Sequence, residues 1–335
     1  MAKNVTVVGA GSWGTALAQV LCDNQNNVKL YDLNQEIVDD INQNHRNSRF
    51  FADVQLPVGL VATTNLTEAL KDAQIILLSV PTKVIRDVLK TINEHLDHAV
   101  MIINASKGIE PGTHKRVSEI VAEEIDQTYL EAFVALSGPS HAEEVIERAL
   151  TTVTCAATVA DKANEIQKMF NNEYFRVYRV DDLIGVEIGG SIKNVIALAA
   201  GIIAGLGYGD NPKAALITRG LVEIKRLGAA VGAKEETFSG LSGLGDLIVT
   251  CTSVHSRNWQ AGYKIGSGSN LQEAIDSMTM VVEGVRTCQA TYEMAQALQI
   301  EMPIVETVYE VIFNKFDPRV AIAQLMTREM KPEFY

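Results

Sequence analysis

A glycine-rich segment near the start of the chain has the spacing of a pyrophosphate-binding loop. Residues 9–14 read Gly-Ala-Gly-Ser-Trp-Gly, and they join the apolar run 5–8 to a helical pattern. In such a motif Gly9 permits a tight turn, Gly11 lets the backbone approach a phosphate, and Gly14 lets the helix pack closely on the strand. The helix N-terminus adds unpaired N–H groups. This context favours a dinucleotide-binding loop over an ordinary glycine turn.

Asp32 is the second residue suited to a dinucleotide. It ends the next apolar run, 18 residues after Gly14 by subtraction, close to the ~20-residue offset at which an acid binds the adenosine ribose hydroxyls. A carboxylate here repels a 2′-phosphate, and no arginine follows before Arg46. The sequence therefore favours NAD over NADP. A solvated acid or a helix cap is the alternative interpretation.

Lys193 is the candidate for proton transfer. At intervals of four residues before and after Lys193 the side chains are small, which gives the series Gly185, Gly189, Lys193, Ala197, Gly201 and Gly205. On a helix this spacing makes one slowly drifting stripe. Small side chains indicate close helix packing, which does not account for a lysine among them. A lysine there is costly to bury without partners and has a tunable pKa. We therefore favour a catalytic role over a structural one.

Two later segments offer partners for this lysine and for a phosphate. Residues 238–246, FSGLSGLGD, are expected to form a glycine-rich turn whose last residue, Asp246, holds Lys193 in its charged form. Residues 256–258 supply a hydroxyl, a guanidinium and an amide in succession. These donor types suit a phosphate group.

The elements that must position these residues change character near Asp182. Before it, strand-like runs alternate with helical patterns; the strands are expected at 5–8, 28–31, 75–80, 100–104, 133–136, 151–156 and 175–180, and the helices at 15–24, 35–44, 84–95 and 113–124. This alternation predicts an α/β fold with a Rossmann-like, mostly parallel sheet, in which ligands bind at the carboxyl ends of the strands. Lys107 follows one such strand and is expected to point toward that crevice.

After Asp182 the chain becomes a series of Ala, Leu, Ile and Gly-rich helical patterns. We expect a Rossmann domain over residues 1–182 and an all-α, substrate-binding domain over 183–335, joined directly by a helix that starts near Leu183. The apolar stretch 195–209 has 15 residues by subtraction and four glycines. It is shorter than the ~20 residues of a membrane span, so it predicts a buried helix and no integral membrane segment.

Composition limits the remaining possibilities. The 335 residues are 47% hydrophobic and carry a formal charge of −12, which argues against nucleic acid or an anionic membrane as a partner. An anionic ligand must therefore be held by a local cluster of cations. The four cysteines are far apart and form no C-x-x-C pair, so reduced thiols are expected and no metal site is predicted. With no export signal in MAKNVTVVGAG, we expect a cytoplasmic protein.

Several long strings, in order along nearly the whole chain, resemble the bacterial NAD(P)-dependent sn-glycerol-3-phosphate dehydrogenases. They are GAGSWGTALA, NASKGIE, LSGPSHAEE, FRVYRVDDLIGVEIGGSIKNVIALAAGI, ALITRGLVEI, GLSGLGDLIVTCTS, HSRN, VVEG and EMPIVETVY. The resemblance implies reversible hydride transfer between a nicotinamide and dihydroxyacetone phosphate, giving sn-glycerol 3-phosphate for phospholipid synthesis. Many members carry His or Arg where this chain has Leu33, which again points to NAD.

The resemblance also implies roles for individual residues. Lys193 matches the proton-transfer lysine. The substrate-site positions that match are Lys107, Gly138, Ser140, Lys193, Asp246, Ser256, Arg257 and Asn258. The matching cofactor contacts, besides the glycine loop, are Ser12, Trp13, Lys107, Ala142, Arg257, Val281 and Glu283.

Two other functions remain open at this point. A 3-hydroxyacid or sugar-acid dehydrogenase shares the lysine on the joining helix but tends to carry Asn four residues later, where this chain has Ala197; Asn194, next to the lysine, is expected to face elsewhere. A non-enzymatic dinucleotide sensor leaves Lys193, Asp246 and Arg257 without a role. The apolar helical half is compatible with a homodimer.

Overall fold

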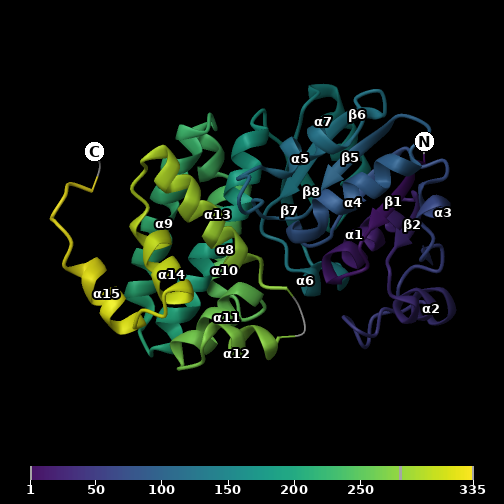
Figure 1. Ribbon diagram of the computed structural model, residues 1–335. Helices are drawn as coiled ribbons and strands as arrows, with labels where there is room; N and C mark the ends of the chain where they lie inside the picture. Colours follow the sequence, from purple (N-terminus) through teal and green to yellow (C-terminus); the bar gives the residue numbers. More distant parts are fainter. Residues whose placement is uncertain (1, 279–280, 334–335) are drawn as a thin grey trace.

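A computed structural model describes residues 2–278 and 281–333. One eight-stranded sheet holds the first half of the chain, and a bundle of helices holds the second (Figure 1). The strands are β1 Asn4–Val8, β2 Asn27–Tyr31, β3 Val61–Thr63, β4 Ile75–Leu78, β5 Val100–Asn104, β6 Leu130–Ser137, β7 Thr151–Ala157 and β8 Phe175–Arg179. The described part of the chain thus has the α/β architecture expected from its sequence.

The sheet has the order β3-β2-β1-β4-β5-β6-β7-β8. Every neighbouring pair is parallel except β6 and β7, which run antiparallel. A mostly parallel sheet is therefore confirmed. Strand β3 was not predicted, because it has three residues and only Ala62 among them is buried. So short a run carries no detectable alternation.

Helices cover both faces of the sheet because its central strands are apolar on both sides. In β4, Ile75 and Leu77 pack into one core with α1, whereas Ile76 and Leu78 pack into the other with α4. The helices of this half are α1 Ser12–Asp23, α2 Gln35–Asn44, α3 Leu66–Leu70, α4 Thr82–His95, α5 Val117–Glu124, α6 Ala142–Ile146 and α7 Ala160–Phe170. The helix expected at 113–124 begins later, since His114 has a left-handed φ of 60°.

The second half is built around α8, Leu183–Gly205, which is almost entirely buried. Its start agrees with the prediction, but the expected buried helix over 195–209 ends at Gly205, and Tyr208 is exposed. The other helices are α9 Asp210–Ala230, α10 Asp246–Thr252, α11 Arg257–Gly266, α12 Leu271–Asp276, α13 Glu283–Leu298, α14 Pro303–Phe313 and α15 Pro318–Met326. Figure 1 shows several of them packed around α8.

The small residues of α8 do permit close packing. A Cβ on Gly201 would lie 2.0 Å from the backbone oxygen of Trp259, and one on Gly205 would lie 2.2 Å from that of Tyr263. Both partners belong to α11, so the two helices touch backbone to backbone. By length and hydropathy α8 is the one described helix that could span a membrane, but most of it is buried inside the fold.

The glycine-rich turn expected at 238–246 is instead helical. A 3₁₀ helix, Glu235–Ser239, leads into a π-helical turn, Leu241–Gly245, which continues directly into α10. A Cβ on Gly243 would lie 2.2 Å from the carbonyl oxygen of Phe238. Gly243 therefore lets the two helical turns pack closely against each other. Asp246 is the first residue of α10 and does not end a loop.

Candidate active site

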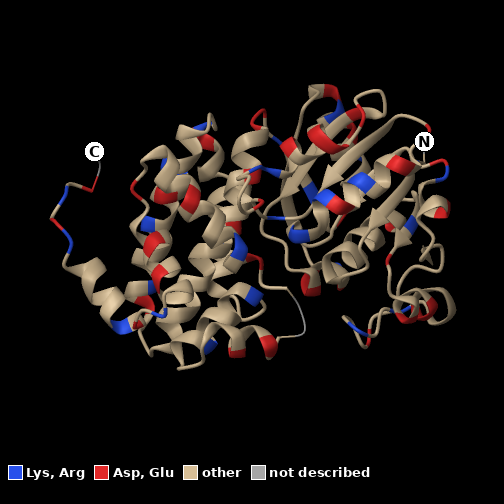
Figure 2. Ribbon diagram, viewed as in Figure 1, with Lys and Arg blue, Asp and Glu red and all other residues tan. Residues whose placement is uncertain are grey.

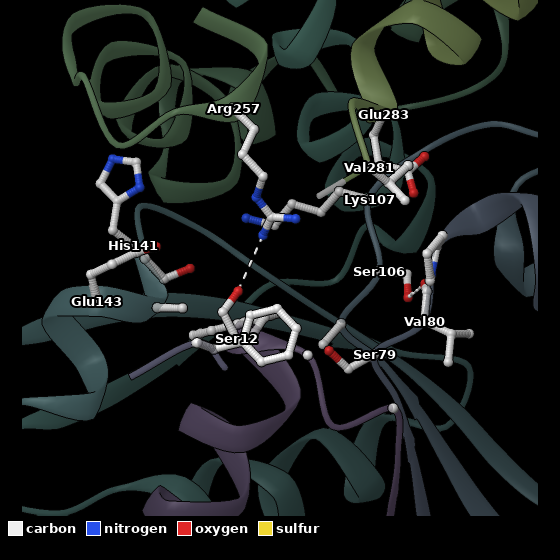
Figure 3. Close-up of a pocket in the computed structure, with 18 of the residues that line it drawn as sticks. Ser12, Ser79, Val80, Ser106, Lys107, His141, Glu143, Arg257, Val281 and Glu283 are labelled. Atoms are coloured by element: carbon white, nitrogen blue, oxygen red, sulfur yellow. Dashed lines mark hydrogen bonds between the residues drawn. The ribbon is translucent and has the colours of Figure 1, made fainter. Parts of the chain in front are cut away.

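A cavity of about 530 Å³ lies where the carboxyl ends of the strands meet the helical half. Most of the predicted site residues line it: Gly9, Gly11, Ser12, Trp13, Asp32, Lys107, Ser140, Ala142, Lys193, Ser256, Arg257, Asn258, Val281 and Glu283. Gly14, Gly138 and Asp246 do not line the cavity but contact residues that do. Residues from both halves thus converge on one space (Figure 3).

The glycine loop has the geometry of a phosphate cradle. Gly9 has a φ of 105°, and a Cβ there would lie 2.7 Å from the backbone oxygen of Ser79. A Cβ on Gly14 would lie 1.9 Å from the Gly9 oxygen, whereas Gly11 faces open space. No side chain caps the N-terminus of α1, so its N–H groups are available to an anion. The loop therefore fits a dinucleotide pyrophosphate.

Asp32 sits at the end of β2 beside this loop. One carboxylate oxygen accepts a hydrogen bond from Ala10 N (2.7 Å), and the other accepts one from Asn34 N (2.9 Å). These contacts fix the acid relative to the glycine loop. Each oxygen keeps a further lone pair that can accept from a ribose hydroxyl.

Lys193 is buried in the middle of α8, with its ammonium at the cavity wall. Its Nζ donates to an Asp246 carboxylate oxygen and to Thr250 Oγ1 (2.7 Å). The Thr250 hydroxyl in turn donates to the Asp246 carbonyl oxygen (2.6 Å), which orients it as an acceptor for the lysine. Burial lowers the pKa of Lys193 to about 8, although the charge of Asp246 raises it. A group with this pKa can both donate and accept a proton near neutral pH.

Asp246 is shared by two ammonium groups. Its second carboxylate oxygen lies 2.7 Å from Lys107 Nζ, which also donates to the Gly138 carbonyl oxygen (3.1 Å). Burial by itself would raise the pKa of Asp246, but Lys107 and Lys193 outweigh that effect and hold the pKa below its usual value. The cluster Lys107–Asp246–Lys193 thus joins the sheet half to α8 and α10 through two buried charges, Asp246 and Lys193, and the half-buried Lys107.

Arg257 is the first residue of α11 and reaches across to the glycine loop. Its Nη2 donates to Ser12 Oγ (3.3 Å), as the dashed line in Figure 3 shows. Ser256 caps the same helix by accepting from Trp259 N (3.2 Å). Asn258 is held on both sides, since its Nδ2 donates to Asn194 Oδ1 (2.9 Å) and its Oδ1 accepts from Gly284 N (2.8 Å). The helix N-terminus and these donors form an anion-binding corner.

Glu283 makes a second contact between the halves. Its carboxylate accepts from both the backbone N (3.0 Å) and the hydroxyl of Thr82, the first residue of α4. Burial raises the pKa of Glu283, and the Thr82 bonds oppose that shift. Val281 and Ala142 also line the cavity, as predicted. Figure 3 labels Glu283 and Val281 among the residues of the cavity, and the charge of Arg257 also opposes the rise that burial causes in the pKa of Glu283.

The expectation that Asn194 faces elsewhere is wrong. Asn194 lines the cavity together with Lys193, because α8 is enclosed by other elements and residues 100° apart on it can border the same space. Thr250 was also missed. It lies four residues after Asp246, on the same helix face, so that spacing could have revealed it.

Two histidines and a turn that line the cavity were missed too. The rings of His141 and His255 lie 5.9 Å apart between centroids, and burial lowers the pKa of His141. Arg49 and Phe50 line the cavity from a turn after α2. No periodic pattern marks these positions in the sequence, because all of them lie on irregular segments.

Comparison with known proteins gives consistent results for both halves. Profiles described as the N-terminus and the C-terminus of NAD-dependent glycerol-3-phosphate dehydrogenase match residues 4–163 and 182–323. Together they cover most of the chain.

Individual relatives agree with these profiles. A glycerol-3-phosphate dehydrogenase [NAD(P)+] from Bacillus cereus is 54% identical over 329 residues, which are 98% of this chain and 97% of the relative. The crystal structure of glycerol-3-phosphate dehydrogenase from Coxiella burnetii is 36% identical and superposes with a TM-score of 0.93, covering 98% and 99% of the two chains. The Saccharomyces cerevisiae enzyme is 28% identical with a TM-score of 0.82, covering 97% and 99%.

Proposed function

Since the chain belongs to the family of NAD-dependent glycerol-3-phosphate dehydrogenases, we propose that it transfers a hydride reversibly between NAD(P)H and dihydroxyacetone phosphate. The product of the reduction is sn-glycerol 3-phosphate, a precursor for glycerophospholipid synthesis. The observation that carries this function is the buried cluster Lys107–Asp246–Lys193, which opens on the same cavity as the glycine loop. The protein is therefore an oxidoreductase that acts on a CH–OH group.

The residues present fit a nicotinamide dinucleotide. The glycine loop and the N-terminus of α1 suit its pyrophosphate, and Asp32 suits the adenosine ribose. From there the cavity extends past Ser12 and Trp13 to Lys107 and Lys193. The bound cofactor supplies or accepts the hydride, and the protein's own residues handle the proton.

Lys193 is the proton carrier in this proposal. During reduction its Nζ gives a proton to the oxygen that was the carbonyl oxygen, and during oxidation the neutral amine takes the proton from the hydroxyl. Thr250 and Asp246 hold the nitrogen in place through the two bonds described above. Lys107 compensates the charge of Asp246 and presents a further donor to the substrate.

The substrate's phosphate fits the corner at the start of α11. Arg257 and Asn258 provide charged and neutral donors there, and the N-terminus of the helix adds its dipole. Ser140 also lines the cavity, and its hydroxyl donates to the Gly138 carbonyl oxygen (2.9 Å). This corner accounts for the capture of an anion by a protein with a formal charge of −12; Figure 2 shows acidic residues on both halves of the molecule.

A steady-state assay tests the function against its alternatives. NADH oxidation is followed with dihydroxyacetone phosphate and, as the matched control, with dihydroxyacetone. We expect turnover that depends on the phosphate group. Preferential oxidation of 3-hydroxyacids or sugar acids by NAD would instead support the related dehydrogenases, and cofactor binding without turnover of any of these compounds would support a sensor.

The proposal also includes a domain boundary, a cellular compartment and an oligomeric state. We place the boundary between the dinucleotide domain and the helical domain near Asp182, between β8 and α8. The four free cysteines suit a reducing compartment, the cytoplasm. A homodimer remains a prediction, to be checked by sedimentation of the purified protein.

A further inference from the structure

Two segments that are separate in the sequence line one part of the cavity, next to the glycine loop. Asp32, Asn34 and Ile37 line it from the end of β2 and the start of α2, and Arg49 and Phe50 line it from the turn after α2. This is the end that the proposed function assigns to the adenosine ribose. The proposed reaction uses no residue of this turn.

The turn is tied to the glycine loop by a buried asparagine. Asn47 is 1% exposed, and its Nδ2 donates to the Ala10 carbonyl oxygen and to Thr15 Oγ1, both at 2.9 Å. The backbone carbonyl oxygen of Asn47 accepts from Phe50 N (3.0 Å), which closes the turn. The backbone of Ala10 thus holds two different side chains, since its carbonyl oxygen accepts from Asn47 and its N–H donates to Asp32. Asp32 and the turn are therefore fixed relative to each other.

The charges at this end are arranged to accept an additional anion. Both Asp32 oxygens already accept a backbone N–H, which partly compensates the carboxylate and weakens its repulsion of a neighbouring phosphate. Arg49 is exposed, and the described residues hold its guanidinium by no hydrogen bond or ion pair. The other lysines and arginines of the lining, Lys107, Lys193 and Arg257, are engaged at the substrate end.

We propose that Arg49 binds the 2′-phosphate when NADP is the cofactor and thereby offsets the preference for NAD that Asp32 and Leu33 favour. Phe50, half-buried on the same turn, packs on the Rossmann core and lines the part of the cavity assigned to the adenosine. The planar guanidinium of Arg49 can donate two parallel hydrogen bonds to a phosphate. This inference rests on the proposed function, because it concerns the cofactor of the same site.

Binding of cofactor fragments tests it without relying on turnover. Titration calorimetry compares 2′-phospho-ADP-ribose with ADP-ribose on the wild type, Arg49→Gln and the matched control Arg46→Gln, whose arginine lies close by but does not line the cavity. Loss of one charge-assisted contact should weaken the phosphorylated fragment about tenfold in Arg49→Gln and change ADP-ribose by less than about twofold. The control should leave both affinities unchanged. Phe50→Ala should weaken both fragments together.

Each other outcome has a definite meaning. Equal weakening of both fragments in Arg49→Gln, or no weakening of the phosphorylated one, would overturn the role of Arg49. Failure of the wild type to bind the phosphorylated fragment while it binds ADP-ribose would also overturn it. If the wild type binds neither fragment and does not oxidise NADH with dihydroxyacetone phosphate, the proposed function itself fails. The kcat/KM values for NADPH and NADH provide a second comparison, in which only the NADPH value should fall.

Discussion

Lys193 is the residue on which the proposed chemistry depends most directly. Its ammonium is buried at the cavity wall and bonded to Asp246 and Thr250. Proton transfer from a positioned group contributes ~10²- to 10⁴-fold to a rate. Lys193→Ala should therefore lower kcat at least ~10²-fold. The exposed helix lysine Lys168 supplies the control Lys168→Ala. Near-normal kcat in folded Lys193→Ala, verified by circular dichroism, would remove Lys193 from the mechanism.

The pKa of Lys193, lowered by burial to about 8, predicts opposite pH profiles for the two directions. Reduction requires the charged ammonium, so kcat/KM for dihydroxyacetone phosphate should fall as the pH rises through about 8. Oxidation requires the neutral amine, so kcat/KM for sn-glycerol 3-phosphate should rise over the same range and then level off. The pKa read from either profile belongs to the interacting groups Lys107, Asp246 and Lys193 together. Two profiles that bend in the same direction would contradict this assignment.

Asp246 should determine where that bend occurs. Its charge raises the pKa of Lys193, so Asp246→Asn should move the bend in the reduction profile to lower pH as well as reduce kcat. A merely structural acid would lower the amount of folded enzyme and leave the bend in place. The matched variant Thr250→Ser keeps the hydroxyl that the lysine binds and should keep the wild-type profile.

At this scale, the sequence indicated the residues whose chemistry stands out from their surroundings. A lysine in a stripe of glycines and alanines, an acid after a glycine-rich run and an arginine between two polar residues are visible without coordinates. Asn194 and Arg49 are not, because their relation to the cavity depends on how α8 is enclosed and on the turn that Asn47 holds. Such tertiary contacts leave no periodic signal.

At the scale of elements, the contact between α8 and α11 leaves no room for a side chain at Gly201. A Cβ there would lie 2.0 Å from the backbone oxygen of Trp259, and backbone cannot rotate away as a side chain can. Gly201→Ala should therefore destabilise the protein by about 1–3 kcal/mol, the usual cost of overpacking, despite the better helix propensity of alanine. Gly59→Ala, where a Cβ meets nothing within 4 Å, is the control. Equal thermal midpoints for the two variants would refute the tight contact.

The boundaries of elements were less predictable than their existence. The strands at 100–104 and 175–180 and the helix at 35–44 lie within one residue of their predicted ends. The sequence predicted a simple turn before Asp246, because a cluster of glycines usually indicates irregular backbone. The structure has a π-helical turn there, in which Gly243 permits close contact with the backbone of Phe238. Local composition cannot separate these two uses of glycine.

At the scale of the molecule, Arg257 links the two halves across the cavity. Its contact with Ser12 joins α11 to the glycine loop, so it should serve the substrate phosphate and the cofactor together. Arg257→Lys keeps the charge but loses the planar fork of donors. We expect a higher KM for dihydroxyacetone phosphate and weaker NADH binding in this variant.

Dihydroxyacetone is the control for the same variant. Its turnover should be much less sensitive to Arg257→Lys, because it carries no phosphate. Equal losses with the two substrates would show that Arg257 does not recognise the phosphate group.

The two-part architecture was predictable because strand-like runs alternate with helical patterns before Asp182, whereas helical patterns follow one another after it. The way in which the parts face each other was not, since it rests on single contacts such as Thr82 with Glu283 and Arg116 with Glu187. These pairs are more than seventy residues apart in the chain. Only the folded structure shows that such residues meet.

The sharing of Asp246 between two lysines has a consequence for the net charge of the buried cluster. With Lys107 and Lys193 both protonated, the cluster carries one positive charge in excess; once Lys193 has given up its proton, the cluster is neutral. A lone lysine–aspartate pair would instead be left with an unbalanced negative charge, which a buried site tolerates poorly. Lys107 thus makes the proton-depleted form of the enzyme an electroneutral state, so that the carboxylate is never left without a counter-ion during the catalytic cycle.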